Sequence, residues 1–335
     1  MTAEAMNGTV AAGQAASAGN GPQTAGPAAL ASATVRALEQ AGLDVADVVR
    51  AVRAAFDEDF RYGPDVTSAA TVAGRTVTAE VAAREAGVVA GLPVALAVFD
   101  LVPEYLGAGA VDAVATMLVA DGTRVAPGDA VLRVSGDAVA VLGAERTMLN
   151  FVTHLSGIAS ATREWADALA GTGAVVRDTR KTLPGLRSLQ KYAVRCGGGE
   201  NHRMALGDAA LIKDNHVAAA GGVAAAVRAV RAAAQSTSTG AELVIEVECD
   251  SVAQVSEALA AGARFLLLDN MPVPTLREAV AVARAYDGVL LESSGRLQVA
   301  NARAVAATGV DYLSVGALTH SSRTLDLGLD YSGSA

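Results

Sequence analysis

The chain has 335 residues, which is enough for two domains or for one barrel with an appended domain. Its net charge of −9 argues against general affinity for nucleic acid or anionic membranes, and no apolar run approaches the ~18 residues that span a bilayer. Two cysteines, Cys196 and Cys249, lack CxxC spacing and exclude a disulfide framework. We therefore expect a soluble, cytoplasmic protein.

The N-terminal part of the chain predicts a tail followed by two helices. Residues 1–30 are small and polar without apolar periodicity, so we expect them to be disordered. The absence of Lys and Arg from this tail argues against a signal or transit peptide. Apolar residues at three- and four-residue spacings predict two short helices between Thr34 and Phe56, separated by residues 41–43.

The same domain continues to about residue 145. Residues 76–91 alternate as a strand does, and residues 92–102 are typical of a helix. Residues 113–143 contain short β-rich pieces separated by turns, in which we interpret Asp121 and Asp129 as turn residues. The pattern predicts a small β or α/β domain over residues 31–145.

Beyond Glu145 the pattern changes to alternating strands and helices. Short apolar runs occur at residues 174–178, 209–215, 243–250, 265–270, 289–295 and 312–317. The last four runs begin 22 to 24 residues apart, with Ala-rich helical patterns between them. This repetition predicts a parallel βα barrel of the TIM type, or an incomplete version of one, over residues 146–335.

Polar residues follow each of these runs, at the end of the barrel where such folds assemble their sites. They are Asp178, Arg180, Lys213, Glu248, Asp269, Ser293, Ser294 and Gly316. Six strand ends that carry both signs of charge predict a charged pocket at this rim.

One stretch, residues 177–216, contradicts the acidic composition of the chain. It holds eight Lys and Arg against four acids, and the three lysines of the protein, Lys181, Lys191 and Lys213, all lie within it. A positive focus in a negative protein favours a small polyanionic ligand. Lys191 shares a predicted helix with Arg187 and Arg195 at four-residue spacing, and this row either lines the rim or faces solvent.

Cationic and acidic side chains suggest different parts of such a ligand. The cations Arg180, Lys181, His202, Arg203 and Lys213 suit several negative charges, because Arg binds carboxylates through a planar fork and Lys binds phosphate as a point charge.

The carboxylates Glu246 and Glu248 share one face of a predicted strand, and Asp269 ends the next strand. Internal salt bridges would cost desolvation, so we interpret Glu248 and Asp269 as ligands of Mg²⁺, substrate hydroxyls or a developing cation. Glu246 we interpret as structural. Glycine turns at residues 293–296 and 314–317 lie where barrels commonly bind phosphate.

The motifs DTRKT, PGLR, GGGENHR, LIKDNH, IEVECDS, LLLDNM, LESSGR and VDYLSVGALTHS, in this order, resemble the quinolinate phosphoribosyltransferase family over roughly residues 34–331. The resemblance implies an N-terminal α/β sandwich domain and a C-terminal open, incomplete TIM-like α/β barrel, with the last residues packing back on the N-terminal domain. The implied enzyme is a pentosyltransferase, nicotinate-nucleotide diphosphorylase (carboxylating), of NAD biosynthesis. It uses quinolinate, phosphoribosyl pyrophosphate and Mg²⁺, needs no organic cofactor, and forms nicotinate mononucleotide, pyrophosphate and CO₂.

The resemblance also assigns residues to these groups. The quinolinate carboxylates and the pyrophosphate would be held by Arg180, Lys181, His202, Arg203 and Lys213, with Thr179 and His320 as further substrate contacts. The ribose and a weakly held Mg²⁺, bound largely through the substrate, would be held by Glu248 and Asp269. The 5-phosphate would be bound by Ser294, Gly295, Arg296, Val315, Gly316 and Ala317.

Four of these residues, Lys181, Lys213, Glu248 and Asp269, are the expected catalytic set. Arg146 would reach in from the partner subunit of a homodimer with shared sites, with a hexamer of such dimers as the larger alternative. Neither nucleic acid nor membrane is an expected partner.

Three alternatives remain open at the level of sequence. A paralogous phosphoribosyltransferase would act on another ring, although the dicarboxylate-binding cations speak against it. A Schiff-base lyase on the same barrel would use the amine of Lys213. A non-catalytic sensor of phosphorylated metabolites would leave the carboxylates unexplained.

Overall fold

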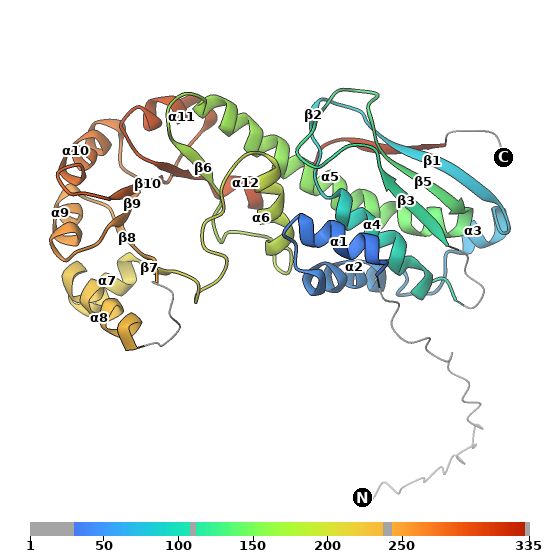
Figure 1. Cartoon of the computed structure of the whole chain (residues 1–335), viewed down its shortest axis with the longest axis horizontal. Coiled ribbons are helices and arrows are strands. Elements are labelled where there is room, and N and C mark those ends of the chain that lie inside the picture. The colour runs from blue at the N-terminus through green and yellow to red at the C-terminus, as the bar shows by residue number, and fades with distance from the viewer. Residues whose placement is uncertain (1–29, 108–111, 237–242, 332–335) are drawn as a thin grey trace, which may run out of the picture.

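The computed structural model describes residues 30–107, 112–236 and 243–331, so the expected tail, apart from Leu30, lies outside the described residues. Two units lie side by side and share one long helix, α5 (Ala138–Leu169) (Figure 1). Among the described residues, no single helix is long and apolar enough to cross a membrane. The helical segments Asp214–Ala220 and Val223–Ala234 meet that length and composition only as a pair bent by 91°.

The N-terminal unit is built on a four-stranded antiparallel sheet with the order β12-β1-β5-β3. Its strands are β1 (Thr76–Ala83), β3 (Ala113–Met117), β5 (Ala130–Asp137) and β12 (Leu327–Tyr331), and a separate pair is formed by β2 (Gly87–Val88) and β4 (Arg124–Val125). The last strand therefore returns from the barrel to the N-terminal sheet, as Figure 1 shows.

Helices pack on this sheet through α4 and α5, because these two contact each other and the strands beside them. The helices here are α1 (Ser32–Gln40), α2 (Val45–Asp59), α3 (Val66–Thr71), α4 (Leu92–Leu101) and the 3₁₀ turn Val102–Glu104. Asp44, Asp65 and Asp137 accept N–H bonds as N-caps of α2, α3 and α5. The two predicted helices before residue 60 and the helix at 92–102 are confirmed.

Asp121 is more than the turn residue that we predicted. Its carboxylate accepts the Gly91 and Leu92 N–H groups at the start of α4, at 2.6 and 3.1 Å, and the hydroxyl of Tyr192 in the barrel unit at 2.6 Å. Burial raises its pKa, and these three donors oppose the rise. The side chain thus joins the two units, which turn composition alone did not reveal.

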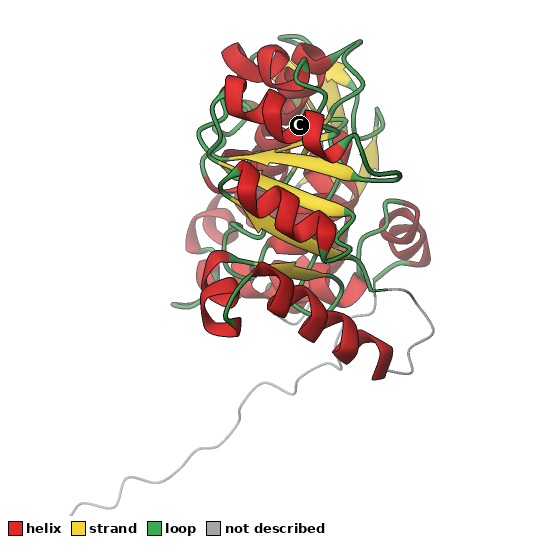
Figure 2. Ribbon diagram, turned by 90° about the vertical axis from the view of Figure 1, so that its left-hand side faces the viewer, coloured by secondary structure: helices red, strands yellow, loops and turns green. Residues whose placement is uncertain are grey.

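The C-terminal unit is a six-stranded parallel sheet with the order β6-β11-β10-β9-β8-β7, which confirms the predicted open barrel. Its strands are β6 (Val175–Arg177), β7 (Ala210–Ile212), β8 (Ile245–Cys249), β9 (Phe265–Asp269), β10 (Leu290–Ser294) and β11 (Tyr312–Ser314). Its helices are α6 (Arg187–Cys196), α7 (Asp214–Ala220), α8 (Val223–Ser236), α9 (Val252–Ala260), α10 (Val273–Ala283), α11 (Val299–Ala306) and α12 (Ala317–His320). Seen from the barrel end, helices lie on the outside of the strands (Figure 2).

The barrel is open between β6 and β7, and an irregular segment lies beside β6 at this opening. Glu200 forms a parallel bridge with Arg177, its N–H donating to Val176 O at 2.9 Å. His202 and Arg203 follow directly, so the gap in the sheet brings both residues to the barrel interior.

Strand alternation divides the inward-facing side chains into two layers. On β8, Glu248 lies nearer the carboxyl end than Glu246, and on β10 Ser294 lies above Glu292 in the same way. The upper layer forms the rim where the polar strand ends were predicted to meet. The lower layer is fully buried.

Candidate active site

A cavity of about 650 Å³ lies at the carboxyl ends of the parallel strands. The predicted residues that line it are Thr179, Arg180, Lys181, His202, Arg203, Lys213, Glu248, Asp269, Ser294, Gly295 and Arg296. They come from segments that follow β6, β7, β8, β9 and β10 and from the segment beside β6. The expectation that strand ends converge on one charged pocket is therefore met in the fold.

The cavity has a cationic side formed by the segments after β6 and β7. The Nε atoms of Arg180 and Arg203 are buried and have no hydrogen-bond partner among the described residues. Burial, followed by repulsion from Arg180, lowers the pKa of Arg203, whose Nη1 donates to Ala209 O at 2.9 Å. Lys181 and Lys213 extend this side and are exposed. Clustered cations whose N–H donors lack a protein partner suit an anionic ligand.

The same cavity is lined by two carboxylates, Glu248 on β8 and Asp269 on β9. Burial raises the pKa of Glu248, attraction to Lys213 opposes the rise, and repulsion from Asp269 adds to it. Lys213 Nζ lies 3.6 Å from Glu248 Oε2. Two neighbouring carboxylates that face one cavity fit a hard cation such as Mg²⁺, which takes few protein oxygens and the rest from phosphates and water.

A strained turn at the end of β10 lies next to Asp269. Gly295 has φ +89°, and a Cβ there would lie 2.2 Å from Asn270 Oδ1. Asn270 and Arg296 also have positive φ, 53° and 51°. The Asn270 side chain donates to Asp269 Oδ2 at 2.6 Å, while its N–H donates to Ser294 O at 2.8 Å. Glycine is therefore required at 295 for the turn that supports Asp269.

The turn after β11 differs in part from its predicted role. The N–H of Val315 donates to Arg177 O at 2.9 Å within the sheet, and its side chain is buried, so it does not point a donor at a phosphate. Gly316 adjoins the pocket residues, since a Cβ there would lie 3.1 Å from Lys181 Cδ, 3.2 Å from His320 Nε2 and 3.3 Å from Thr179 Oγ1. Ala317 begins the short helix α12.

Two residues that the sequence placed at the rim, Lys191 and Asp178, are instead buried and form an ion pair with each other. Lys191 is fully buried, and its Nζ donates to Asp178 Oδ1 and, at 2.8 Å, to His202 O. Asp178, expected at the pocket, also accepts the His202 N–H at 2.9 Å. Our prediction that Lys191 faces the rim or solvent is therefore wrong. Of its two predicted neighbours on the helix, Arg195 is exposed and Arg187 is half-buried.

Arg146 lies outside this cavity. It is an exposed residue of α5, in the part of the helix that lies with the N-terminal unit.

The sequence missed several residues that line the cavity. They are Leu211, Leu267, Asn270, Glu292 and Ser314. Alternation along β10 would have identified Glu292, because it lies two residues before Ser294 and shares its face. Nothing in the sequence singled out Asn270, whose importance comes from its positive φ.

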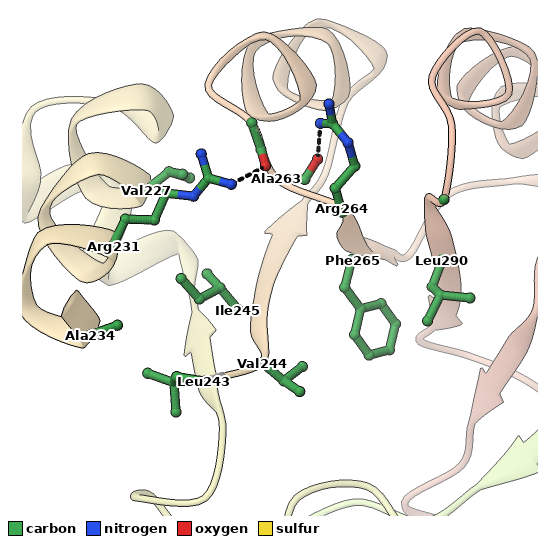
Figure 3. A pocket seen from close by; sticks show the side chains of 12 residues that line it. Val227, Arg231, Ala234, Leu243, Val244, Ile245, Ala263, Arg264, Phe265 and Leu290 are labelled. Carbon is green, nitrogen blue, oxygen red and sulfur yellow. Dashed lines mark hydrogen bonds between the residues drawn. The ribbon is translucent and has the colours of Figure 1, made fainter. Parts of the chain in front are cut away.

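A different cavity, of about 770 Å³, lies at the amino ends of the strands, between α8 and β8 to β10 (Figure 3). Its lining is mostly apolar. Its two arginines bond backbone carbonyls, Arg231 to Gly262 O at 2.8 Å and Arg264 to Ala263 O at 2.7 Å. The described residues that line it include no carboxylate and no converging cations, so this lining lacks the chemistry of the rim cavity.

Sequence profiles of two domains match this chain. The profile of the quinolinate phosphoribosyl transferase N-terminal domain matches residues 65–156, and that of the C-terminal domain matches residues 158–330. The chain belongs to the quinolinate phosphoribosyl transferase family. The family predicted from the motifs is thus confirmed.

Similar members of this family span nearly the same length. A nicotinate-nucleotide pyrophosphorylase [carboxylating] of Mycobacterium leprae is 55% identical over 83% of this chain and 95% of its own. A solved nicotinate-nucleotide pyrophosphorylase from Francisella tularensis has a TM-score of 0.79 at 36% identity, covering 87% of this chain and 98% of its own. NadC from Streptococcus pyogenes has a TM-score of 0.77 at 37% identity, covering 87% and 99%.

The fold extends beyond close relatives. The human nicotinic acid phosphoribosyltransferase has a TM-score of 0.52 at 13% identity over 78% of this chain and 71% of its own, a similarity of fold alone. The identity of the ring that is bound must therefore come from the site.

Proposed function

We propose that the protein is a quinolinate phosphoribosyltransferase (decarboxylating), the pentosyltransferase that makes nicotinate mononucleotide, pyrophosphate and CO₂ from quinolinate and phosphoribosyl pyrophosphate. The observation that carries the proposal is that cationic side chains and two carboxylates line one cavity at the strand ends. Two ring carboxylates and a pyrophosphate match the cationic side chains. A ribose that develops positive charge matches the two carboxylates.

The reaction needs no nucleophilic side chain from the protein. The lone pair of the quinolinate nitrogen forms the bond to C1 of the ribose while the bond from C1 to the pyrophosphate oxygen breaks. The bond between ring C2 and its carboxylate then breaks, CO₂ leaves, and the electron pair on C2 takes up a proton. The positive charge on the ribosylated nitrogen stabilises that pair. The enzyme contributes orientation and charge stabilisation.

The cationic side would bind the ring carboxylates and the leaving pyrophosphate. We assign the ring carboxylates to Arg180 and Arg203 and the pyrophosphate to Lys181 and Lys213, with Thr179 and His320 as further contacts. His202 supports this side of the cavity, because its Nδ1 accepts the Arg203 N–H. The unpartnered Nε atoms of Arg180 and Arg203 support the carboxylate role, because an unbonded buried donor is costly until a ligand accepts from it. The 5-phosphate would lie at the turn of Ser294, Gly295 and Arg296 and at Gly316 and Ala317.

Glu248 and Asp269 would stabilise the ribose as C1 gains oxocarbenium character, and they would hold Mg²⁺ together with the substrate oxygens. When bound, Mg²⁺ neutralises charge on the leaving pyrophosphate. Lys213, 3.6 Å from Glu248, is placed to act on the same leaving group.

A homodimer with shared sites is part of the proposal. Arg146 is exposed and does not line the cavity of its own subunit, so a catalytic role for it requires a neighbouring subunit. A cytoplasmic location is also proposed, because phosphoribosyl pyrophosphate is too highly charged to cross a membrane unaided.

The assay that tests the function supplies purified protein with Mg²⁺, quinolinate and phosphoribosyl pyrophosphate. We expect CO₂ and nicotinate mononucleotide in equal amounts. An absence of turnover with quinolinate would contradict the proposed function. Nicotinate in place of quinolinate tests the paralogue that uses another ring. Borohydride trapping on Lys213 tests the Schiff-base lyase, which would leave Arg180, Arg203 and Asp269 without a role.

The shared site is tested by mixing two inactive variants. Arg146→Ala and Lys181→Ala should each fold and each lose activity, because they lie in different parts of one composite site. Mixed dimers would contain one site with neither substitution, so part of the activity should return. Two inactive variants that stay inactive after subunit exchange would count against a site built from two subunits.

A further inference from the structure

The buried layer beneath the rim cavity contains a histidine between two carboxylates. His202 lines both the rim cavity and a smaller cavity of about 360 Å³ on its other side. Its Nε2 atom lies 2.9 Å from Glu246 Oε2 and 3.5 Å from Glu292 Oε1. All three side chains are almost fully buried.

The backbone of Arg203 determines which ring nitrogen of His202 carries the proton. The Arg203 N–H donates to His202 Nδ1 at 2.7 Å, so Nδ1 presents its lone pair. Burial also lowers the pKa of His202, which keeps the ring neutral. The single ring proton therefore lies on Nε2 and faces the carboxylates.

This tautomer excludes a metal site formed by His202 and the two carboxylates. The ligand atoms of His202, Glu246 and Glu292 lie within 4.8 Å of one another, a spacing that a metal ion could bridge. A metal on Nε2 would need the lone pair there and a proton on Nδ1, which would break the bond from Arg203 N–H. The cluster thus suits a proton between the histidine and the carboxylates.

The two carboxylates are not equivalent. Glu292 already bonds elsewhere, because Arg177 Nη1 donates to its Oε2 at 2.8 Å and the Ser314 hydroxyl donates to its Oε1. Glu246 is different. Its Oε1 has no hydrogen-bond partner among the described residues, and its Oε2 faces His202. Burying a carboxylate without other partners is costly, so its placement calls for a role toward His202.

We propose that Glu246 is a positioning residue for the reaction: its carboxylate faces the Nε2–H of His202 and fixes the tautomer and ring orientation that hold Arg203 at the pocket. The inference rests on the proposed function and adds a residue that does not touch substrate. A carboxylate that orients a neutral histidine in this way resembles the support that buried partners give to histidines in other sites.

The expected consequence is selective for one substrate. Without an acceptor at 246, the ring of His202 can rotate or change tautomer, and the Arg203 N–H loses its partner at Nδ1. Arg203 belongs to the cationic side, so binding of the ring carboxylates should suffer. The turn at Gly295, on the opposite side of the cavity, should keep its affinity for phosphoribosyl pyrophosphate.

The test compares Glu246→Leu with Glu246→Gln in the complete enzyme. The amide oxygen of Gln can still face the Nε2–H, whereas Leu cannot, although the two side chains are similar in size. For Glu246→Leu we expect the KM for quinolinate to rise at least tenfold and the KM for phosphoribosyl pyrophosphate to stay within twofold. Glu246→Gln should stay within threefold of the wild type for both. A folded Glu246→Leu variant with the wild-type KM for quinolinate would overturn the proposal.

A second measurement does not depend on activity. Nitrogen NMR of ¹⁵N-histidine-labelled wild-type protein, with the His202 signals identified by their loss in His202→Gln, should show a protonated Nε2 and an unprotonated Nδ1. Glu246→Gln should give the same pattern. A proton on Nδ1, or a charged ring, in the wild type overturns the inference even if Glu246→Leu fails to fold. Wild-type protein that is inactive with quinolinate but has this tautomer would instead contradict the proposed function.

Discussion

Exposed and buried charged residues of one barrel serve opposite purposes. At the rim, Lys181 and Lys213 are exposed, and the carboxylates Glu248 and Asp269 keep contact with solvent. Other charged side chains of the barrel are buried and bonded to each other, as Lys191 is to Asp178 and Arg177 is to Glu292. Charge that is left accessible can bind a ligand, whereas charge that already has a buried partner holds the frame in place.

The buried ion pairs connect directly to the rim. Asp178 accepts the backbone N–H of His202, and Lys191 donates to the His202 carbonyl. A single ion pair therefore fixes the segment that carries His202 and Arg203. Arg177 lies 4.5 Å from the Tyr312 ring centroid while it bonds Glu292. The frame therefore positions the binding groups without contributing atoms to the cavity mouth.

The largest effect should come from breaking the buried ion pair. Lys191→Met leaves the Asp178 carboxylate buried without its cation, which should lower the free energy of unfolding by about 3–5 kcal/mol. The matched control, Lys181→Met at the rim, should change it by less than about 0.5 kcal/mol while activity is lost. Urea unfolding of both variants, with the CO₂ assay alongside, measures the contrast. Equal stability losses would abolish the distinction between buried and exposed charges.

The next effect concerns pH and the buried carboxylate Glu246. Burial raises its pKa to about 7, against opposing attraction from Arg177 and Arg203. The unfolded chain loses this proton near pH 4.5, so the folded state is progressively disfavoured as the pH rises from about 4.5 to 7. Above pH 7 the full penalty remains.

Glu246→Gln should remove that penalty. The free energy of unfolding of Glu246→Gln minus that of the wild type should be about 2–3 kcal/mol larger at pH 8 than at pH 5. Urea unfolding of both proteins at the two pH values measures this change. The control on the same strand is Glu248→Gln, which is nearer to solvent and should show a smaller change. A difference that does not vary with pH would mean that Glu246 does not hold a proton in the folded protein.

The features of this molecule that could be predicted from the sequence are those that depend on a local residue pattern. Apolar runs and their spacing predicted all six barrel strands, because each strand carries its own pattern. The residue types at the strand ends predicted most of the cavity lining for the same reason. The burial of Lys191 was not predictable from helical spacing, since its partner Asp178 comes from another element and tertiary packing alone brings them together. Asn270 was missed because backbone conformation, not residue type, gives it its place.

The smallest effect tests the turn that supports Asp269. Gly295→Ala and Gly171→Ala both introduce a Cβ at positive φ, +89° and +78°, so each should lower the free energy of unfolding by about 1–2 kcal/mol. The sites differ in space: nothing lies within 4 Å of a Cβ at 171, whereas at 295 it would meet Asn270 Oδ1 at 2.2 Å. Asn270 must then move, and with it the amide that bonds Asp269. Steady-state kinetics should therefore show that the KM for phosphoribosyl pyrophosphate rises about tenfold in Gly295→Ala and stays unchanged in Gly171→Ala. An unchanged KM in Gly295→Ala would mean that this turn does not contribute to binding the ribose phosphate.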